Sequence, residues 1–202
     1  MALNKEEVRR RIIDLGHALI AKGGSEALQA RIIAKDVGIS VGSIYNLVGD
    51  MDELHRLINS ELLDELGMVG SGAVQELDAK NVTDLRSRLL ALAHAYFDFV
   101  ERNQKQWAAL LAFNRSTTSE DTPDWYMVRL EMLFDIISDN LNDTPLGNDP
   151  HKCKIAARAL WSSVHGIVSN SFVGRDDALL RESTLEQIDL LVSIFVKGLR
   201  TE

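Results

Sequence analysis

IAKDVGISVGSIYNLVGDMDEL, residues 33–54, is the stretch that decides the fold of this chain. Gly38 follows an apolar helical face and can adopt the left-handed conformation that ends a helix. Ser40 then offers its hydroxyl as the N-cap of a second short helix. Two short helices separated by a glycine turn are the layout of a helix-turn-helix, whose second helix fits the major groove of DNA.

The second helix of this pair is expected to have a buried and an exposed face. Ile44 and Leu47 lie three residues apart and are predicted to point inward. The side chains left outside can bond phosphates, contact a thymine methyl group or, for Asn46, pair with adenine. The residues predicted to bind DNA are Arg31, Ser40, Val41, Gly42, Ser43, Tyr45 and Asn46. The alternative is a short α-hairpin inside a helical core, but the closure of the helix at Gly49 and Asp50 favours DNA binding.

Residues 9–66 resemble the DNA-binding domain of the TetR family of bacterial transcriptional regulators. The positions that match the family pattern are Gly24, Ile33, Ala34, Gly38, Ile39, Ser40, Gly42, Ser43, Ile44, Tyr45 and Leu54. Val48 stands where the family usually has Phe, and Met51 stands where it usually has a Lys that contacts a DNA phosphate. The resemblance implies a homodimeric repressor that leaves a palindromic operator when a small-molecule effector binds.

The net charge of −8 is unusual for a DNA-binding protein, but the charges are unevenly distributed. Residues 1–48 hold seven Lys or Arg and five Asp or Glu, a net charge of +2, so the remaining residues carry −10. Acidic groups elsewhere lower non-specific DNA binding, while local basic groups can still meet phosphates. Arg9, Arg10 and Arg11 are either a phosphate clamp or a solvated helix face paired with Glu6 and Glu7.

Helical periodicity runs through the chain, so the expected fold class is all-α. An N-terminal three-helix helix-turn-helix domain is expected at 1–50, a connecting helix at 51–66, and a larger helical effector-binding and dimerisation domain at 67–202. Gly67, Gly70 and Gly72 predict a joint after the connecting helix. Further elements are expected as helices near 5–22, 82–102, 104–113, 123–141 and 150–173, a loop at 114–122, and a last helix to about 200 that begins with a capping box at Ser183 and Glu186.

The last two expected helices carry the best candidate for a dimer interface. Their apolar stripes are Leu160, Val164, Ile167 and Val168 on one helix, and Leu185, Ile188, Leu191, Val192, Phe195 and Leu199 on the other. Two helices from each of two subunits can form a four-helix interface. Alternatively, both stripes belong to the core of a single subunit; the family resemblance favours a homodimer.

Residues 156–172 resemble the ligand-domain segment of a TetR subgroup with a Trp-x-x-x-His-Gly signature, here Trp161, His165 and Gly166. A separation of four residues places Trp161 and His165 on the same helix face. His165 is either an effector contact or a histidine of the core or interface with a satisfied partner. The candidate residues for an apolar effector pocket are Trp107, Leu111, Trp125, Tyr126, Phe134, Trp161 and His165; alternatively, these are only the large residues of a helical core.

The sequence contains no motif of the common enzyme classes. The five histidines lack a metal-ligand spacing, and neither a phosphate-binding loop nor a G-x-S-x-G motif occurs. No cofactor, metal or enzymatic activity is therefore expected.

The single cysteine, Cys153, fits a reducing compartment, and no signal segment or membrane-spanning run is recognised, so a cytoplasmic protein is expected. The acidic residues beside Met51 leave one alternative function, a helical ligand-binding or protein-interaction module with weakened DNA binding.

Overall fold

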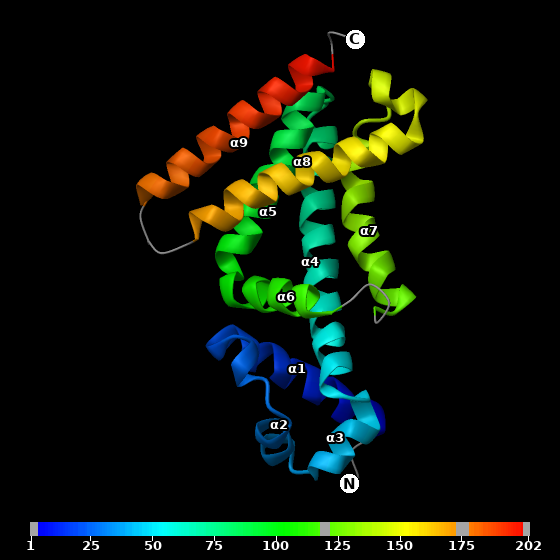
Figure 1. Cartoon of the computed structure of the whole chain (residues 1–202), viewed down its shortest axis with the longest axis vertical. Helices are drawn as coiled ribbons and strands as arrows, with labels where there is room; N and C mark the ends of the chain where they lie inside the picture. Colours follow the sequence, from blue (N-terminus) through cyan, green and yellow to red (C-terminus); the bar gives the residue numbers. More distant parts are fainter. Residues whose placement is uncertain (1–3, 118–121, 173–177, 200–202) are drawn as a thin grey trace. The chain divides into compact units, whose positions relative to one another are not determined.

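The computed structural model describes residues 4–117, 122–172 and 178–199, and within these ranges the chain is helical and contains no strand (Figure 1). The expected all-α class is thereby confirmed. The chain divides into two compact units. The N-terminal unit comprises residues 1–64 and 103–127, and the C-terminal unit comprises residues 65–102 and 128–202. The predicted segments 1–50, 51–66 and 67–202 are divisions by function, and they stay predictions.

The N-terminal unit is built from short helices around one apolar core. Its elements are α1 (Lys5–Gly23), the 3₁₀ helix η1 (Ser25–Ala27), α2 (Ala30–Val37), α3 (Val41–Val48), the first half of α4 (Met51–Ala79), α6 (Gln104–Ser116) and the beginning of α7 (Asp124–Asp139). Asn4 and Glu7 begin α1 with a reciprocal capping box. α6 packs against α1, where Ala109 joins the core and Lys105 donates to the carbonyl of Lys22. The core of this unit therefore depends on a segment that is distant in sequence.

The C-terminal unit is made of longer helices. It contains the second half of α4, α5 (Leu85–Arg102), most of α7, the 3₁₀ helix η2 (Pro145–Asn148), α8 (Pro150–Ser171) and α9 (Ala178–Gly198). α9 packs along α5 and α8, as Figure 1 shows. The predicted start of α8 is confirmed, because the Asp149 carboxylate accepts the backbone N–H groups of His151 and Lys152.

One long helix, α4, takes the place of the connecting helix and the joint predicted near residue 66. It continues through Gly67, Gly70 and Gly72, so the loose stretch predicted at these glycines is wrong, although the boundary between the two units lies nearby at residues 64 and 65. A glycine inside a helix costs roughly 1 kcal/mol relative to alanine, which packing can offset. Gly67 lies beside Leu133 of α7, and Gly70 lies beside Leu92 of α5. These tertiary contacts maintain the helix where local sequence signals predicted a break.

The ends of two other helices also differ from the prediction. The last helix begins at Ala178, so Ser183 lies inside it and the predicted capping box is wrong. The carbonyl of Ser183 accepts a bond from Gln187 one turn later. A Ser-x-x-Glu pair is compatible with a helix interior, and the packing of α9 on α5 and α8 continues the helix. α6 extends to Ser116, beyond the start of the loop predicted at 114–122, of which residues 118–121 lie outside the described residues.

The described residues offer neither a metal site nor a membrane-spanning helix. In those ranges, no group of three or more His, Cys, Asp or Glu residues is placed to hold a metal ion. Across the same part of the chain, no helix has both the length and the apolar character that crossing a membrane requires.

Candidate nucleic-acid interface and ligand cavity

The turn between α2 and α3 has the geometry that the sequence predicts. Gly38 has φ 78° and ψ 33°, the left-handed conformation of a glycine that ends a helix. The backbone N–H groups of Gly38 and Ile39 both donate to the carbonyl of Ala34 at 3.0 Å. Ser40 caps α3, where its hydroxyl accepts the N–H of Ser43 at 3.0 Å. The predicted helix-turn-helix backbone is therefore confirmed.

α3 has one buried and one exposed face. Ile44 has 0% of its surface exposed, whereas the neighbouring Tyr45 is 41% exposed and Asn46 also faces solvent. Leu47 is half-buried and packs against the apolar core of the N-terminal unit. The seven residues predicted to bind DNA all reach the surface of the chain: Arg31, Ser40, Gly42, Tyr45 and Asn46 are exposed, and Val41 and Ser43 are half-buried. DNA contact by these residues stays a prediction, and their exposure is compatible with it.

The basic cluster on α1 is largely occupied by interactions within the unit. Arg10 bonds to Asp14 on its own helix and to Glu61 on α4, whose Oε2 lies 3.0 Å from the guanidinium. The hydrogen bond from Arg10 lowers the pKa of the Asp14 carboxyl group. Arg11 donates to the carbonyl of Asp36 at 3.2 Å. These contacts favour the ion-paired helix face over a phosphate clamp, although the acidic partners differ from those predicted.

The start of α4 shows what the chain has in place of the expected phosphate-contacting Lys. Met51 is half-buried and packs against the apolar core of the N-terminal unit. The Asp50 carboxylate accepts the N–H of Glu53 at 2.7 Å and so caps the helix. Methionine therefore contributes to the core at this position, and the adjacent acidic side chains add negative charge.

Four of the seven residues predicted for an effector pocket lie in the N-terminal unit: Trp107, Leu111, Trp125 and Tyr126. Trp107 and Tyr126 are buried, and Leu111 and Trp125 are half-buried. The Tyr126 hydroxyl donates to Oδ1 of Asn114 at 3.0 Å. None of the four lines the cavity found in the C-terminal unit.

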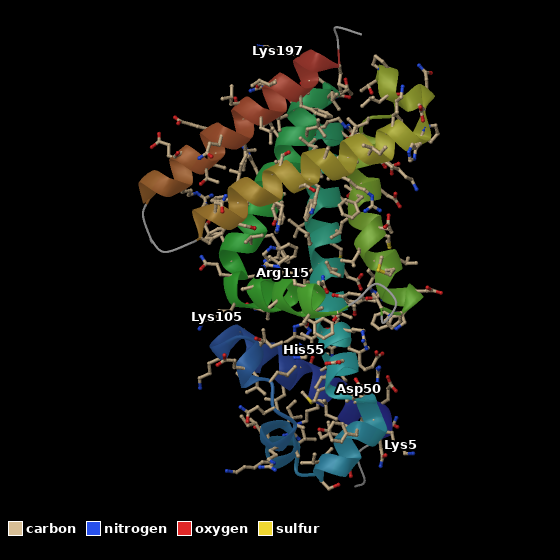
Figure 2. All side chains as sticks on the ribbon, in the orientation of Figure 1. Lys5, Asp50, His55, Lys105, Arg115 and Lys197 are labelled. Atoms are coloured by element: carbon tan, nitrogen blue, oxygen red, sulfur yellow. The ribbon has the colours of Figure 1, made fainter. Side chains whose placement is uncertain are left out.

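His55, on α4 beside α6, is a polar residue of this unit that no sequence motif marks (Figure 2). Its ring stacks on that of Phe113, with centroids 5.1 Å apart and planes inclined by 16°. Within the described part of the chain, Nδ1 of His55 is buried without a hydrogen-bond partner. Burial lowers the pKa of His55, and the negative charge of Asp52 partly opposes this shift. The N-terminal unit thus holds one imidazole nitrogen out of water without a hydrogen-bond partner.

The C-terminal unit contains a cavity of about 50 Å³. Its lining comes from α4, α5, α7, α8 and α9 and consists of Leu66, Gly70, Leu89, Leu92, Ala93, Tyr96, Leu133, Ile136, Ile137, Leu160, Trp161, Val164 and Val192. None of these residues carries a charge. Of the predicted pocket residues, Trp161 lines the cavity, and Phe134 and His165 make ring contacts with Trp161 without lining it.

Tyr96 connects the cavity lining to His165. A hydrogen bond of 2.6 Å joins the Tyr96 hydroxyl and Nδ1 of His165, and Nε2 of His165 lies 3.3 Å from the hydroxyl of Ser169. The Trp161 ring stacks on His165 with an interplanar angle of 8°, and its centroid lies 4.6 Å from that of Tyr96. His165 therefore has a partner at both ring nitrogens, as the alternative of a satisfied histidine requires. Tyr96 was missed as a site residue because its partner is 69 positions away in the sequence.

Half of the residues in the apolar stripes predicted for a dimer interface are buried in the C-terminal unit. Leu160, Val164 and Val168 on α8 and Ile188 and Val192 on α9 are buried. Among the described residues of these two helices, the large apolar side chains that are exposed are Ile155 at 53%, Leu190 at 61% and Ile194 at 60%. The other stripe residues are half-buried: Ile167, Leu185, Leu191, Phe195 and Leu199. The buried residues of the stripes therefore belong to the subunit core, and the dimer interface stays a prediction.

The glycine turn, the exposed α3 and the all-helical C-terminal unit define a helix-turn-helix protein. Residues 89–192, just over half of the chain, match a family model described as the tetracyclin repressor-like C-terminal domain. The chain therefore belongs to the TetR family of transcriptional regulators. Its assignment to the Trp-x-x-x-His-Gly subgroup stays a prediction.

Several known sequences and structures are similar to this chain. The uncharacterized HTH-type transcriptional regulator Rv0681 of Mycobacterium tuberculosis is 23% identical over 170 residues, which cover 82% of this chain and 71% of that protein. The HTH-type transcriptional regulator Rv1816 of the same species is 26% identical over 106 residues, and the match covers 52% of this chain but only 44% of that protein. The TetR family transcriptional regulator PfmR from Thermus thermophilus shares the fold with a TM-score of 0.63 at 19% identity, over 91% of this chain and 97% of that one. A protein of unknown function from Rhodococcus sp. RHA1 shares it with a TM-score of 0.74, also at 19% identity, over 95% of each chain.

Proposed function

We propose that this regulator is a repressor that binds a palindromic operator as a homodimer and leaves it when a small-molecule effector binds. The observation that carries the proposal is that α3 has one buried and one exposed face: Ile44 is 0% exposed, and Tyr45 is 41% exposed. Burial of Ile44 fixes the helix on its unit, so Tyr45 and Asn46 are held outward. Membership of the TetR family supports DNA as the molecule that these side chains meet.

In the proposed complex, α3 enters the major groove. The Asn46 amide pairs with N6 and N7 of an adenine, which is the base edge that an asparagine matches. Arg31, Ser43 and Tyr45 contact the sugar–phosphate backbone and fix the orientation of the helix. Val41 makes an apolar contact with a thymine methyl group. Asn46 thus recognises the hydrogen-bonding pattern of a base, and the other residues position α3 in the groove.

The proposed homodimer forms through α8 and α9. The exposed side chains of Ile155, Leu190 and Ile194 support this arrangement, because they are apolar and lie on these two helices. Dimeric helix-turn-helix proteins place their recognition helices about 34–36 Å apart, one turn of the duplex. A symmetric pair of subunits therefore requires an operator with two inverted half-sites.

The proposed effector site is the cavity lined by Tyr96 and Trp161. An effector shifts the protein away from its DNA-binding arrangement only if it binds the two arrangements unequally. α4 is suited to carry such a shift, because the same unbroken helix begins at Met51 and also contributes Leu66 and Gly70 to the cavity lining.

A second candidate function is a helical ligand-binding or protein-interaction module with weakened DNA binding. Met51 favours it, because this side chain packs against the core where relatives are expected to have a phosphate-contacting Lys. Asp50, Asp52 and Glu53 add negative charge at the same helix start. Loss of one phosphate contact and added negative charge both lower the affinity for DNA.

Selection of bound duplexes from a random pool, followed by electrophoretic binding to the selected sequence, tests the proposal. A repressor of this kind is expected to select a palindrome and to bind it less tightly as the salt concentration rises. A reporter gene placed behind that palindrome is expected to be repressed. If no duplex is enriched from the pool, the repressor proposal fails and the binding module is favoured.

A further inference from the structure

We infer that the cavity in the C-terminal unit takes an uncharged, compact and largely apolar ligand, of the size of a single aromatic ring. This inference rests on the proposed function for the regulatory role of the ligand. The chemical class of the ligand follows from the residues that line the cavity.

The lining of the cavity sets the charge of the ligand. No residue that lines it carries a charge. Two arginines of this unit are paired with acidic side chains outside the lining: Arg86 pairs with Asp189 at 2.7 Å, and Arg158 pairs with Glu131. A carboxylate or ammonium group that enters the cavity therefore loses its hydration and finds no counter-ion, which makes its binding far less favourable than that of a neutral group.

Two aromatic side chains shape the cavity. Tyr96 is 3% exposed and is anchored by its hydrogen bond of 2.6 Å to His165, so its ring is a fixed wall. The ring of Trp161 lies 4.6 Å from that of Tyr96, between centroids, and the two planes are inclined by 51°. At this spacing the two rings contact each other, and the surfaces that they turn to the cavity can meet a flat apolar group through offset and edge contacts. A neutral ring therefore matches the lining better than a polar chain does.

The volume of the cavity limits the size of the ligand. It also indicates which side chain moves when a ligand binds. A cavity of about 50 Å³ is smaller than an engineered apolar cavity of roughly 150 Å³ that binds benzene. A ring-sized ligand therefore has to displace part of the wall. Trp161 is half-buried and is held by ring contacts with residues such as Phe134, whereas Tyr96 is buried and hydrogen-bonded. Trp161 is therefore the wall residue whose surroundings change when a ligand binds.

Three probes with the same benzene ring but different charge separate the effect of charge from that of shape. They are benzyl alcohol, which is neutral, benzoate, which is an anion, and benzylammonium, which is a cation. The full chain, isotope-labelled with heavy nitrogen, is titrated with each probe at neutral pH. The indole N–H resonance of Trp161, assigned with Trp161→Phe, reports binding. We expect a saturable shift with benzyl alcohol and binding of both ions that is weaker on the order of tenfold or more. Equal binding of either ion, or no saturable shift with the alcohol, overturns the inference.

A cavity-filling variant and a matched control test whether the probe that shifts the Trp161 resonance binds in this cavity. Ala93→Val adds two methyl groups at a buried lining position, and Ala79→Val adds the same groups at the exposed end of α4. Ala93→Val is expected to weaken binding of benzyl alcohol on the order of tenfold, and Ala79→Val is expected to leave it unchanged. If Ala93→Val does not fold, Gly70→Ala provides the same test with one added methyl group, which meets Leu92 at an ordinary contact distance of 3.5 Å. Unchanged binding in the folded cavity variant contradicts the inference.

Failure of this inference is distinguishable from failure of the proposed function, because duplex selection is carried out without any probe. A protein that selects a palindrome but binds no neutral probe contradicts the cavity inference alone. A protein that binds benzyl alcohol in the cavity but selects no duplex contradicts the proposed function alone.

Discussion

The two units of the chain present different kinds of surface to a partner. In the N-terminal unit, α3 exposes the polar side chains of Tyr45 and Asn46 to solvent. In the C-terminal unit, the cavity is lined without a charged residue, and the hydroxyl of Tyr96 is already bonded to His165 at 2.6 Å. The difference indicates that α3 is suited to a polar partner and that the cavity is suited to an apolar one.

The largest expected effect is a difference in stability between variants on the buried and exposed faces of α3. Ile44→Ala removes a fully buried side chain from the core and is expected to lower the free energy of unfolding by about 2–5 kcal/mol. Tyr45→Ala changes the next, exposed position and is expected to cost less than about 0.5 kcal/mol. Chemical denaturation of both variants measures the difference. Equal losses would mean that α3 does not have a core face and a free face.

The next effect concerns DNA affinity rather than stability. Asn46→Ala is expected to weaken binding to the selected duplex by about 1–3 kcal/mol and to relax the preference at one base pair of each half-site. Asn142→Ala, at an exposed position of the C-terminal unit, is the matched control and is expected to bind as the wild type does. Electrophoretic titrations measure both affinities. Wild-type affinity in Asn46→Ala would show that this amide reads no base.

A third variant tests whether the polar pair beside the cavity is structural. Tyr96→Phe keeps the ring but removes the hydroxyl that bonds to His165. Loss of a hydrogen bond from a buried group is expected to lower the free energy of unfolding by about 1–3 kcal/mol. Denaturant titration measures the change, with Tyr45→Ala as the exposed comparison. A Tyr96→Phe variant as stable as the wild type would contradict an anchoring role for this bond.

The helix-turn-helix could be predicted from the sequence because its determinants are local. The left-handed Gly38 and the capping Ser40 each act on backbone groups within a few residues. The cavity could not be predicted, because its lining comes from five helices that meet only after folding. Aromatic composition identified Trp161, which lines the cavity, but it also identified Trp107 and Tyr126, which lie in the other unit. Amino-acid composition shows which side chains are large, but it does not show which of them are in contact in the folded chain.

The continuity of α4 was missed for the same physical reason, and it leads to a smaller effect. Glycine signals are local, whereas the contacts that maintain the helix are tertiary. Gly72→Ala is expected to raise the free energy of unfolding by about 0.5–1 kcal/mol, because an added methyl group meets no atom within 4 Å. Thermal or chemical denaturation measures the gain. A loss of stability would instead indicate that this segment needs the conformational freedom of glycine.

The smallest expected effect is a pH dependence in the N-terminal unit. Burial lowers the pKa of His55 below its ordinary value of about 6.5, so the unfolded chain binds more protons than the folded chain at mildly acidic pH. The stability associated with neutral His55 is fully present above about pH 6.5 and is lost as the pH falls from there towards the lowered pKa. Denaturation midpoints measured over this range are expected to vary less in His55→Gln than in the wild type. Identical pH profiles would show that His55 does not contribute.

The most direct test of DNA recognition by α3 is the binding of the double variant Tyr45→Ala with Asn46→Ala to the duplex that the wild-type chain selects. Both side chains are exposed, so the double variant is expected to keep the helical signal and thermal midpoint of the wild type while losing sequence-specific binding. Wild-type affinity and specificity in the folded double variant would contradict DNA recognition by this face of α3.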